Sequence, residues 1–520
     1  MHEFQRSSLI VCLLSAPFFS CWSARFFVST TGNDSNLGTI DQPFLTITKA
    51  ISLSSPMFQP GDTVFVGGGV YVNSVTISIS QKGTATARYQ LLAYPGERPI
   101  LDFSSMQVSS SNRGIKLSGS YWYIRGFDIK GAGDNGMHIS GSNNIIEFCA
   151  FYENRDTGLQ LSNGASNNQI INCDSYFNAD PTGENADGFA AKLDVGTGNS
   201  FYGCRSWQNC DDGFDGYLST SDDVRTTLEC CWIFKNGYLK DGSPSLPKGD
   251  GNGFKMGGGD NGNADSLRHN VTLKNCLAFD NRVKGYDQNN NRGSMRLLNC
   301  TAYRNGTNYG MNAGVKSGET MMLTNCVALG SAVSIWAGAV QTTDSWMNPP
   351  FSPVTDADFV SVDTTGLRGP RKPDGSLPDI SFLHLAPGSQ LIDAGTDVGI
   401  SYNGPAPDLG AFETGGVTDV AASGPSTIAG FRLFQNYPNP FNPATTISYL
   451  IPRDGNVVIR IYDVRGRIVR EILNEQQGAG QHVVCWDGRD ECLGPAASGV
   501  YFVRVAFKGA TQTAKIVLLR

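Results

Sequence analysis

The chain has 520 residues, a formal net charge of −7, 61 glycines and only 17% charged residues. It is too long for one ordinary domain, and its acidic balance argues against a nucleic-acid partner. The many glycines and few charges favour short strands with frequent turns over long helices. We therefore expect an all-β protein.

Residues 1–24 have the pattern of a secretory signal peptide. Arg6 precedes an apolar run from Leu9 to Phe19, and small residues follow from Ser20. The run is too short to serve as a permanent membrane anchor. We expect it to be cleaved from a protein that is secreted and either extracellular or attached to the cell surface.

The next segment, residues 25–60, predicts a strand, a polar loop, a short helix around 47–54 and a second strand. Such a unit can cover the first coil of a larger sheet, because an uncovered edge exposes unpaired backbone groups.

An internal repeat then provides the strongest structural signal. Seven segments, which we interpret as strands, share an aligned cysteine: Cys149, Cys173, Cys204, Cys231, Cys276, Cys300 and Cys326. In six of them an asparagine follows at the same spacing: Asn154, Asn178, Asn209, Asn236, Asn281 and Asn305. The seventh has Ser331 there, and Cys210, Cys230, Cys485 and Cys492 fall outside the repeat without an evident pairing.

The repeat has a period of about 24 residues with insertions, which is typical of one coil of a β-solenoid. Stacked cysteines then serve as small inward-facing hydrophobes, and stacked asparagines form a hydrogen-bonded ladder at a turn. We predict a right-handed parallel β-helix over residues 25–415, with the irregular segment 331–415 capping it.

Beyond the solenoid, a linker of small residues spans 416–430, and 431–520 has alternating strands with turn signals that predict a small β-sandwich. The motifs NYPNPFNPATTISY and KIVLLR in this part resemble the C-terminal sorting domain of type IX secretion cargo. The resemblance implies that outer-membrane secretion machinery is a partner.

A second column of the repeat carries polar residues. In ADGFA, DDGFD, GNGFK and VKGYD the aromatic residue should point inward and the next residue outward. The outward column is His138, Gln160, Ala190, Asp215, Lys255, Asp287 and Asn312. The column before the glycine includes Asp187, Asp212, Asn252 and Lys284.

Four carboxylates, those of Asp187, Asp211, Asp212 and Asp215, thus gather in two neighbouring coils. Like charges stacked this closely repel, and a hard divalent cation removes the conflict. Calcium accepts an irregular set of oxygens better than magnesium does. Two simpler interpretations remain, because Asp-Gly is common in turns and a calcium ion can be purely structural.

The segments ENADGFAAK, NCDDGFDGY, GNGFKMGG and KGYDQNNNRGSM resemble motifs of the family 9 polysaccharide lyases, chiefly pectate lyases. The resemblance covers residues 25–410. It implies that the four aspartates bind a catalytic Ca²⁺ and that Lys255, one coil further on, is the general base. Lys284, Asp287 and Arg292 are further candidates for contacts with an acidic polysaccharide.

The sequence therefore predicts a calcium-dependent pectate lyase, acting as a monomer, that cleaves polygalacturonate by β-elimination to unsaturated oligogalacturonides. One alternative is a lyase or hydrolase for another uronic-acid polysaccharide, although the Gly-His-Gly and Arg-Ile-Lys signatures usual in pectin hydrolases do not occur. Another is a non-catalytic carbohydrate-binding or adhesion protein, which would keep both ladders but has no need of Lys255.

Overall fold

The computed structural model describes residues 23–53, 57–245, 249–259, 266–372, 375–415 and 431–519, the last range without 434, 435, 437–440, 442, 444, 452, 479, 492 and 493. The chain divides into two compact units, Met1–Gly416 and Val417–Arg520. The expected signal peptide, apart from Ser23 and Ala24, and the expected linker lie outside the described residues.

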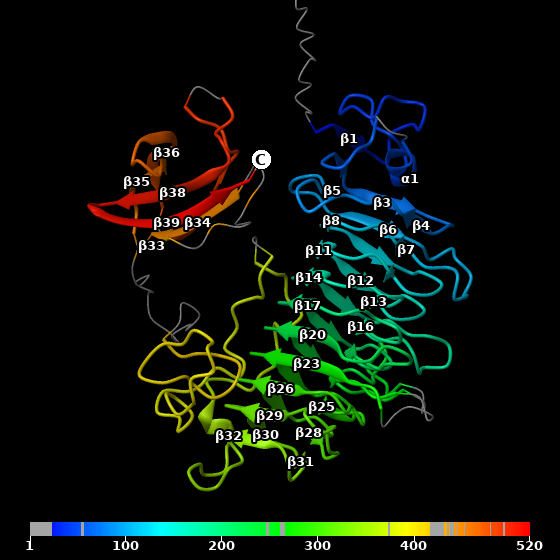
Figure 1. The fold of residues 1–520 in the computed structure, drawn as a ribbon, viewed down its shortest axis with the longest axis vertical. Helices are drawn as coiled ribbons and strands as arrows, with labels where there is room; N and C mark the ends of the chain where they lie inside the picture. The colour runs from blue at the N-terminus through cyan, green and yellow to red at the C-terminus, as the bar shows by residue number, and fades with distance from the viewer. Residues whose placement is uncertain are drawn as a thin grey trace, which may run out of the picture. The chain divides into compact units, whose positions relative to one another are not determined.

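Three parallel sheets build the first unit, and their strands stack along its length (Figure 1). The 12-stranded sheet A contains β1 (Arg25–Val28), β2 (Thr63–Val66), β5 (Tyr89–Ala93), β8 (Trp122–Arg125), β11 (Ile145–Glu147), β14 (Gln169–Ile171), β17 (Asn199–Tyr202), β20 (Val224–Glu229), β23 (His269–Lys274), β26 (Met295–Leu298), β29 (Met321–Thr324) and β32 (Val340–Thr342). The 10-stranded sheet B contains β3 (Gly69–Val72), β6 (Pro99–Asp102), β9 (Asp128–Lys130), β12 (Ala150–Tyr152), β15 (Asp174–Tyr176), β18 (Arg205–Trp207), β21 (Trp232–Phe234), β24 (Leu277–Phe279), β27 (Thr301–Tyr303) and β30 (Val327–Leu329). The 10-stranded sheet C contains β4 (Ile77–Ile79), β7 (Ile115–Leu117), β10 (Met137–Ile139), β13 (Leu159–Leu161), β16 (Phe189–Ala191), β19 (Phe214–Asp215), β22 (Phe254–Lys255), β25 (Lys284–Asp287), β28 (Thr307–Met311) and β31 (Val333–Ile335).

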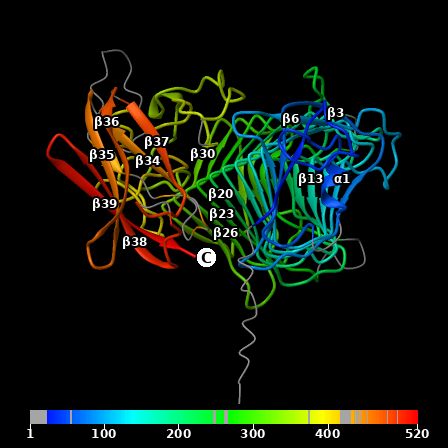
Figure 2. The same ribbon diagram turned by 90° about the horizontal axis from the view of Figure 1, so that it is seen from above.

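Each coil passes through sheets A, B and C in turn, and every strand pairs with its counterpart one coil away. Figure 2 shows successive sheet A strands β20, β23 and β26 side by side. This is a parallel β-helix, as predicted. The short helix α1 (Ile47–Ile51) buries Ile47, Ala50 and Ile51 against the first coil, and Thr46 caps it by accepting from the backbone N–H of Lys49 at 3.1 Å.

The aligned cysteines are free and buried in the interior, but they lie between strands and not on them. The residue before each cysteine has a left-handed backbone, for example Phe148 (φ 53°), Asn172 (φ 51°) and Gly203 (φ 62°). This conformation turns the chain from sheet A into sheet B. The expectation that the cysteines sit on strands was therefore wrong, because the bend precedes them. Cys210 and Cys230 are also free.

The asparagine ladder forms as expected. Each side-chain amide donates to the side-chain oxygen of the next coil's asparagine at 2.8–3.0 Å, along the series Asn154, Asn178, Asn209, Asn236, Asn281 and Asn305. Asn305 then donates to Asn308 at 3.0 Å, which ends the ladder in place of Ser331. All of these amides are buried.

We expect Asn281→Ala to lower the stability of the solenoid by about 1–3 kcal/mol, because it leaves buried partners on both sides without a hydrogen bond. Thermal denaturation followed by circular dichroism measures this as a lowered Tm. The matched control is Asn403→Ala at an exposed position. Equal melting of the two variants would contradict a stabilising role for the ladder.

The irregular segment after the repeat has two parts. Its first part forms β31 and β32 and packs Trp336 and Trp346 on the last coil of the solenoid core, as a cap would. Its second part covers the flank of sheet B, which was not expected. Its apolar residues, among them Phe359, Leu367 and Phe382, form one cluster with sheet B residues such as Trp207 and Phe279. The short 3₁₀ helix η1 (Asp356–Asp358) belongs to this segment. The stacked rings of Trp207, Phe234 and Phe279 on sheet B would be exposed without this cover, so burying them is favourable.

The second unit, taken by itself, has two antiparallel sheets around one core that includes Ile447, Ile459, Trp486 and Val503. One sheet contains β33 (Arg432–Leu433), β34 (Thr445–Ile451) and β37 (Gly480–Trp486). The other contains β36 (Ile468–Gln477), β35 (Gly455–Asp463), β38 (Gly499–Phe507) and β39 (Ala510–Leu518). This is the small β-sandwich expected from the alternating pattern.

Candidate active site

The outward column of sheet C follows the predicted register over most of its length. Successive pairs align His138 with Gln160, Gln160 with Ala190, Ala190 with Asp215, Asp215 with Lys255 and Lys255 with Asp287. The insertion before Lys255 therefore does not displace it from the column.

The last position of the column was predicted wrongly. Gly310 pairs with Asp287, where Asn312 was expected. Tyr309 takes the inward position beside Tyr286, and the two rings stack with centroids 4.9 Å apart. Each hydroxyl also donates to an interior carbonyl, which fixes the tyrosines in equivalent places.

A second column lies just before each strand of sheet C. The side-chain oxygen of Asp187 accepts from the backbone N–H of Asp212 at 3.2 Å, and that of Asp212 accepts from the N–H of Asn252 at 2.7 Å. Asn252 in turn accepts from Lys284. One oxygen of each carboxylate thus ties neighbouring coils together. The other oxygen of Asp187 accepts from the hydroxyl of Thr157 at 3.0 Å and from Lys192 at 2.6 Å.

The glycine after each member of this column has a packing role. A Cβ on Gly213 would lie 2.0 Å from Ile233 Cγ2, so no larger residue fits there. The Asp-Gly-Phe pattern is therefore partly structural, and the chemistry resides in the aspartates.

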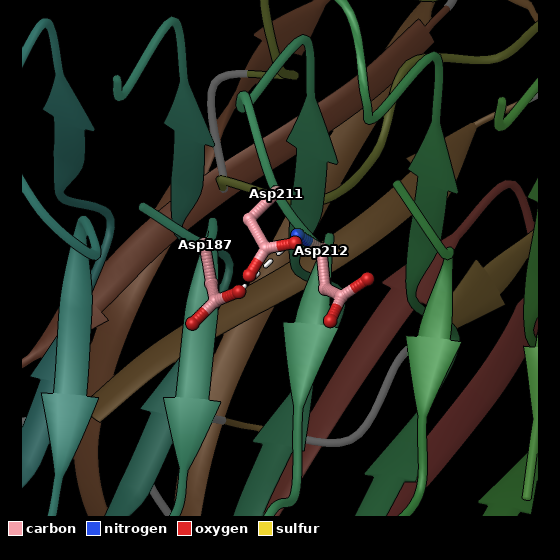
Figure 3. Close-up of side chains that lie close together, drawn as sticks. All are labelled: Asp187, Asp211 and Asp212. Atoms are coloured by element: carbon pink, nitrogen blue, oxygen red, sulfur yellow. Dashed lines mark hydrogen bonds between the residues drawn. The ribbon is translucent and has the colours of Figure 1, made fainter. Parts of the chain in front are cut away.

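Three of the four predicted metal ligands come together. Asp187, Asp211 and Asp212 each offer a carboxylate oxygen, and these oxygens all lie within 4.8 Å of one another. Figure 3 shows the side chains arising from neighbouring coils. All three are at most 3% exposed.

Asp215, the fourth predicted ligand, lies outside this triad. It is buried between two lysines, with Lys192 Nζ 3.3 Å from Oδ2 and Lys255 Nζ 3.9 Å from Oδ1. Burial alone would raise the pKa of Asp215, but Lys255 and Lys192 lower it below its usual value.

The three carboxylates of the triad have raised pKa values. Burial raises the pKa of Asp211 to about 10, and Asp212 adds to the effect. Burial also raises the pKa of Asp187 to about 6 and that of Asp212 well above its usual range. Carboxylates held this close are costly to ionise together without further positive charge.

Lys255 lies at the edge of the triad. Its Nζ is 3.0 Å from Asp212 Oδ2 and 2.7 Å from Asp250 Oδ2. Burial by itself would lower the pKa of Lys255, but Asp212, Asp215 and Asp250 raise it well above its usual value. Asp250 ends the insertion 238–250 that precedes Lys255, and no motif of the repeat marks it as a site residue.

Lys192 is a buried site residue that sequence reasoning missed. Its Nζ contacts Asp187 Oδ2 at 2.6 Å and Asp215 Oδ2 at 3.3 Å, and the side chain is 10% exposed. Its pKa is raised, because Asp187 and Asp215 outweigh the opposing effect of burial. The motif ENADGFAAK contains it, so its position two residues after outward-facing Ala190 was an available signal.

The other candidates lie further along the same face. Lys284 Nζ pairs with Asp287 Oδ1 at 2.9 Å, and both residues belong to β25, one coil beyond Lys255. Arg292 follows β25 and donates through Nη1 to the carbonyl of Gly314 at 2.6 Å.

The donor set fits a hard divalent cation. The four buried aspartates and Asp250 face two lysines, so full ionisation leaves an excess of negative charge that a dication would reduce. Asp212 Oδ2 is buried and accepts no hydrogen bond, although Lys255 Nζ lies 3.0 Å away in a poor direction for one. An all-oxygen set of this kind suits calcium.

Comparison with known proteins accounts for this arrangement. The family described as "Pel9A-like, right handed beta helix region" matches residues 26–325, which include the triad, Lys192 and Lys255. The chain belongs to the Pel9A-like β-helix family. This membership also gives the solenoid its right-handed sense.

Individual relatives agree with the family match. Pectate lyase L of Dickeya dadantii (strain 3937) is 38% identical over 401 residues, or 75% of this chain and 90% of that protein. The solved structure of pectate lyase Pel9A is 37% identical with a TM-score of 0.69, covering 75% of this chain and 97% of that one. A rhamnogalacturonan lyase structure is 28% identical with a TM-score of 0.61, covering 70% of this chain and 97% of that one.

The C-terminal unit has a match of its own, to an FlgD Ig-like domain over residues 445–510. That match supports an Ig-like sandwich and is different from the sorting domain that the sequence motifs resemble. Over the described residues, no helix has the length and apolar character needed to cross a membrane.

Proposed function

We propose that this protein is a calcium-dependent pectate lyase that cleaves polygalacturonate by β-elimination. The observation that carries the proposal is the alignment of Lys255 with Asp215 beside three converging carboxylates, in a chain of the Pel9A-like family. A hydrolase or an adhesion protein would not require a buried lysine in that position.

The reaction follows from the chemistry of galacturonate. Lys255 in its neutral form removes the C5 proton, which lies next to the C6 carboxylate. The electron pair of the C5–H bond becomes the C4–C5 double bond, and the C4–O bond breaks. The released oxygen gains a proton, and no water is consumed. A calcium ion, when bound, supplies positive charge that stabilises the negative charge developing on the substrate carboxylate.

Other residues of the site bind the ion, stabilise its ligands or contact the substrate. Asp187, Asp211 and Asp212 would hold the ion, with Asp215 at its border. Lys192 keeps Asp187 and Asp215 ionised by contributing a fixed positive charge. Lys284 and Arg292 are candidates to bind further substrate carboxylates, and Asp287 orients Lys284.

The test is a panel of uronic-acid polymers with calcium and with chelator, measured by the ultraviolet absorbance of the unsaturated product. We expect the highest rate on polygalacturonate. The structural match to a rhamnogalacturonan lyase makes rhamnogalacturonan the informative comparison. A higher rate on rhamnogalacturonan would reassign the substrate, and no absorbance on any polymer would overturn the lyase activity.

The proposal extends to location. The signal-like residues 1–24 and the motifs NYPNPFNPATTISY and KIVLLR support export by type IX secretion machinery to the cell surface or medium. A pectate polymer cannot enter the cell, so an enzyme acting on it must be outside. We infer a monomer, with the C-terminal sandwich serving export and not catalysis.

A protein comprising residues 25–415 should therefore fold and keep its activity on polygalacturonate, because the first unit is compact and has a hydrophobic core of its own. Circular dichroism and the product assay measure the two properties. Loss of soluble β-rich protein would mean that the solenoid needs its C-terminal unit.

A further inference from the structure

A second concave site lies on sheet B, a different face of the solenoid from the acidic triad. A cavity of about 310 Å³ lies between the sheet and the chain segment 364–369. Phe234, Lys235 and Phe279 form its solenoid side, and Arg368 lies on the opposite segment. This volume is at the lower end of the range for small-molecule sites.

The segment that forms the outer wall is held in place. Arg205, which is 2% exposed, donates from Nη1 to the carbonyls of Leu367 at 2.8 Å and Gly369 at 2.9 Å. Its guanidinium also pairs with Asp174 at 2.8 Å, and the Leu367 side chain is buried. The wall is thus formed before any ligand arrives, which reduces the ordering cost of binding.

The cavity is cationic. Its lining contains Lys235 and Arg368 but no carboxylate. Across the described chain neither side chain has a hydrogen bond or ion pair. Burial lowers the pKa of Arg368, and no acid opposes the effect.

The nearby carboxylates are already engaged. Asp363 accepts from the N–H and hydroxyl of Thr365, and Asp280 pairs with Arg304 at 3.0 Å. Phe234 and Phe279 stack with ring centroids 4.6 Å apart and give the solenoid side of the cavity an apolar surface beside Lys235. An anion that enters the cavity therefore meets Lys235 and Arg368 and no competing carboxylate in the lining.

We propose that this cavity binds a carboxylate of a uronate oligosaccharide, as a second site outside the lyase cleft. The proposal rests on the proposed function for the choice of sugar. A guanidinium binds a planar carboxylate through two parallel hydrogen bonds. Lys235 contributes a second charge, and the Thr364 hydroxyl in the lining can bond a sugar hydroxyl.

The test is calorimetric titration of galacturonate trisaccharide into the full chain carrying Lys255→Ala, with chelator present to suppress calcium-dependent binding in the cleft. Adding Lys235→Ala and Arg368→Ala should weaken binding by about tenfold or more, since one lost charge-assisted contact is worth that much. The methyl-esterified trisaccharide should not bind. The matched control is Arg225→Ala with Arg296→Ala, which removes the same charge from exposed positions on sheet A.

Equal affinity with and without Lys235 and Arg368 would overturn the proposal. Equally effective binding of sulfate would overturn the assignment to a sugar. Arg368→Gln alone gives a milder variant at an exposed position, so a folding defect cannot hide the result. The lyase assay on the wild type tests the proposed function independently of this titration. Lyase activity without binding in the cavity would therefore overturn only the second site.

Discussion

Lys255→Ala should lower the turnover of polygalacturonate by about 10²- to 10⁴-fold, the usual contribution of a positioned general base. The loss should appear in kcat, because the variant removes proton transfer and not substrate contacts. Lys255→Arg should lose nearly as much, since guanidinium stays protonated at any working pH. The matched control is Lys274→Ala, which removes a partly exposed lysine from sheet A and should leave turnover unchanged.

If Lys255 is the general base, the reaction rate should increase with pH. Asp212, Asp215 and Asp250 raise the pKa of Lys255, so the neutral form that accepts a proton is scarce at neutral pH. Raising the pH increases that form, and the rate should rise on the alkaline side until Lys255 is neutral. Bound calcium should bring this rise to lower pH by neutralising the adjacent carboxylates. Equal rates for Lys255→Arg and wild type at alkaline pH would exclude Lys255 as the base.

Removal of calcium should abolish activity, and calcium should restore it better than magnesium. The reason is the concentration of negative charge at Asp187, Asp211 and Asp212, which the ion pairs with Lys192 and Lys255 offset only in part. Dialysis against chelator, followed by titration of each metal into the product assay, measures the effect. Full activity after exhaustive chelation would contradict the proposal.

Asp212→Asn tests the same calcium site by changing one of its expected ligands. The amide oxygen can still accept from the N–H of Asn252, so the tie between coils is kept while one charge is lost. Calcium affinity, measured by calorimetry, should fall by about tenfold or more, because ligand charge sets affinity in oxygen sites. Asp397→Asn, at an exposed position, is the control. Unchanged affinity in Asp212→Asn would place the ion elsewhere.

The amino-acid sequence alone predicts the solenoid and most of its register. The aligned cysteines, beginning with Cys149, repeat once per coil, and so do the asparagines. Each coil is one continuous stretch of the chain, and it stacks on the equivalent stretch of the next coil. A residue's neighbours one coil away are therefore fixed by the repeat alone. Asp187, Asp212, Asp215 and Lys255 could be placed on one face for that reason.

The side-chain contacts within the site are known only from the tertiary structure. The cluster of three carboxylates without Asp215, the ion pairs of Lys192 and the contact of Asp250 with Lys255 depend on side-chain directions that a period does not specify. The cluster that Phe351, Phe359 and Phe382 form with sheet B joins parts of the chain that are far apart in sequence, as does the contact of Arg371 with Asp174. Such contacts follow from which apolar surface remains to be buried once the coils have stacked, and no local pattern records that.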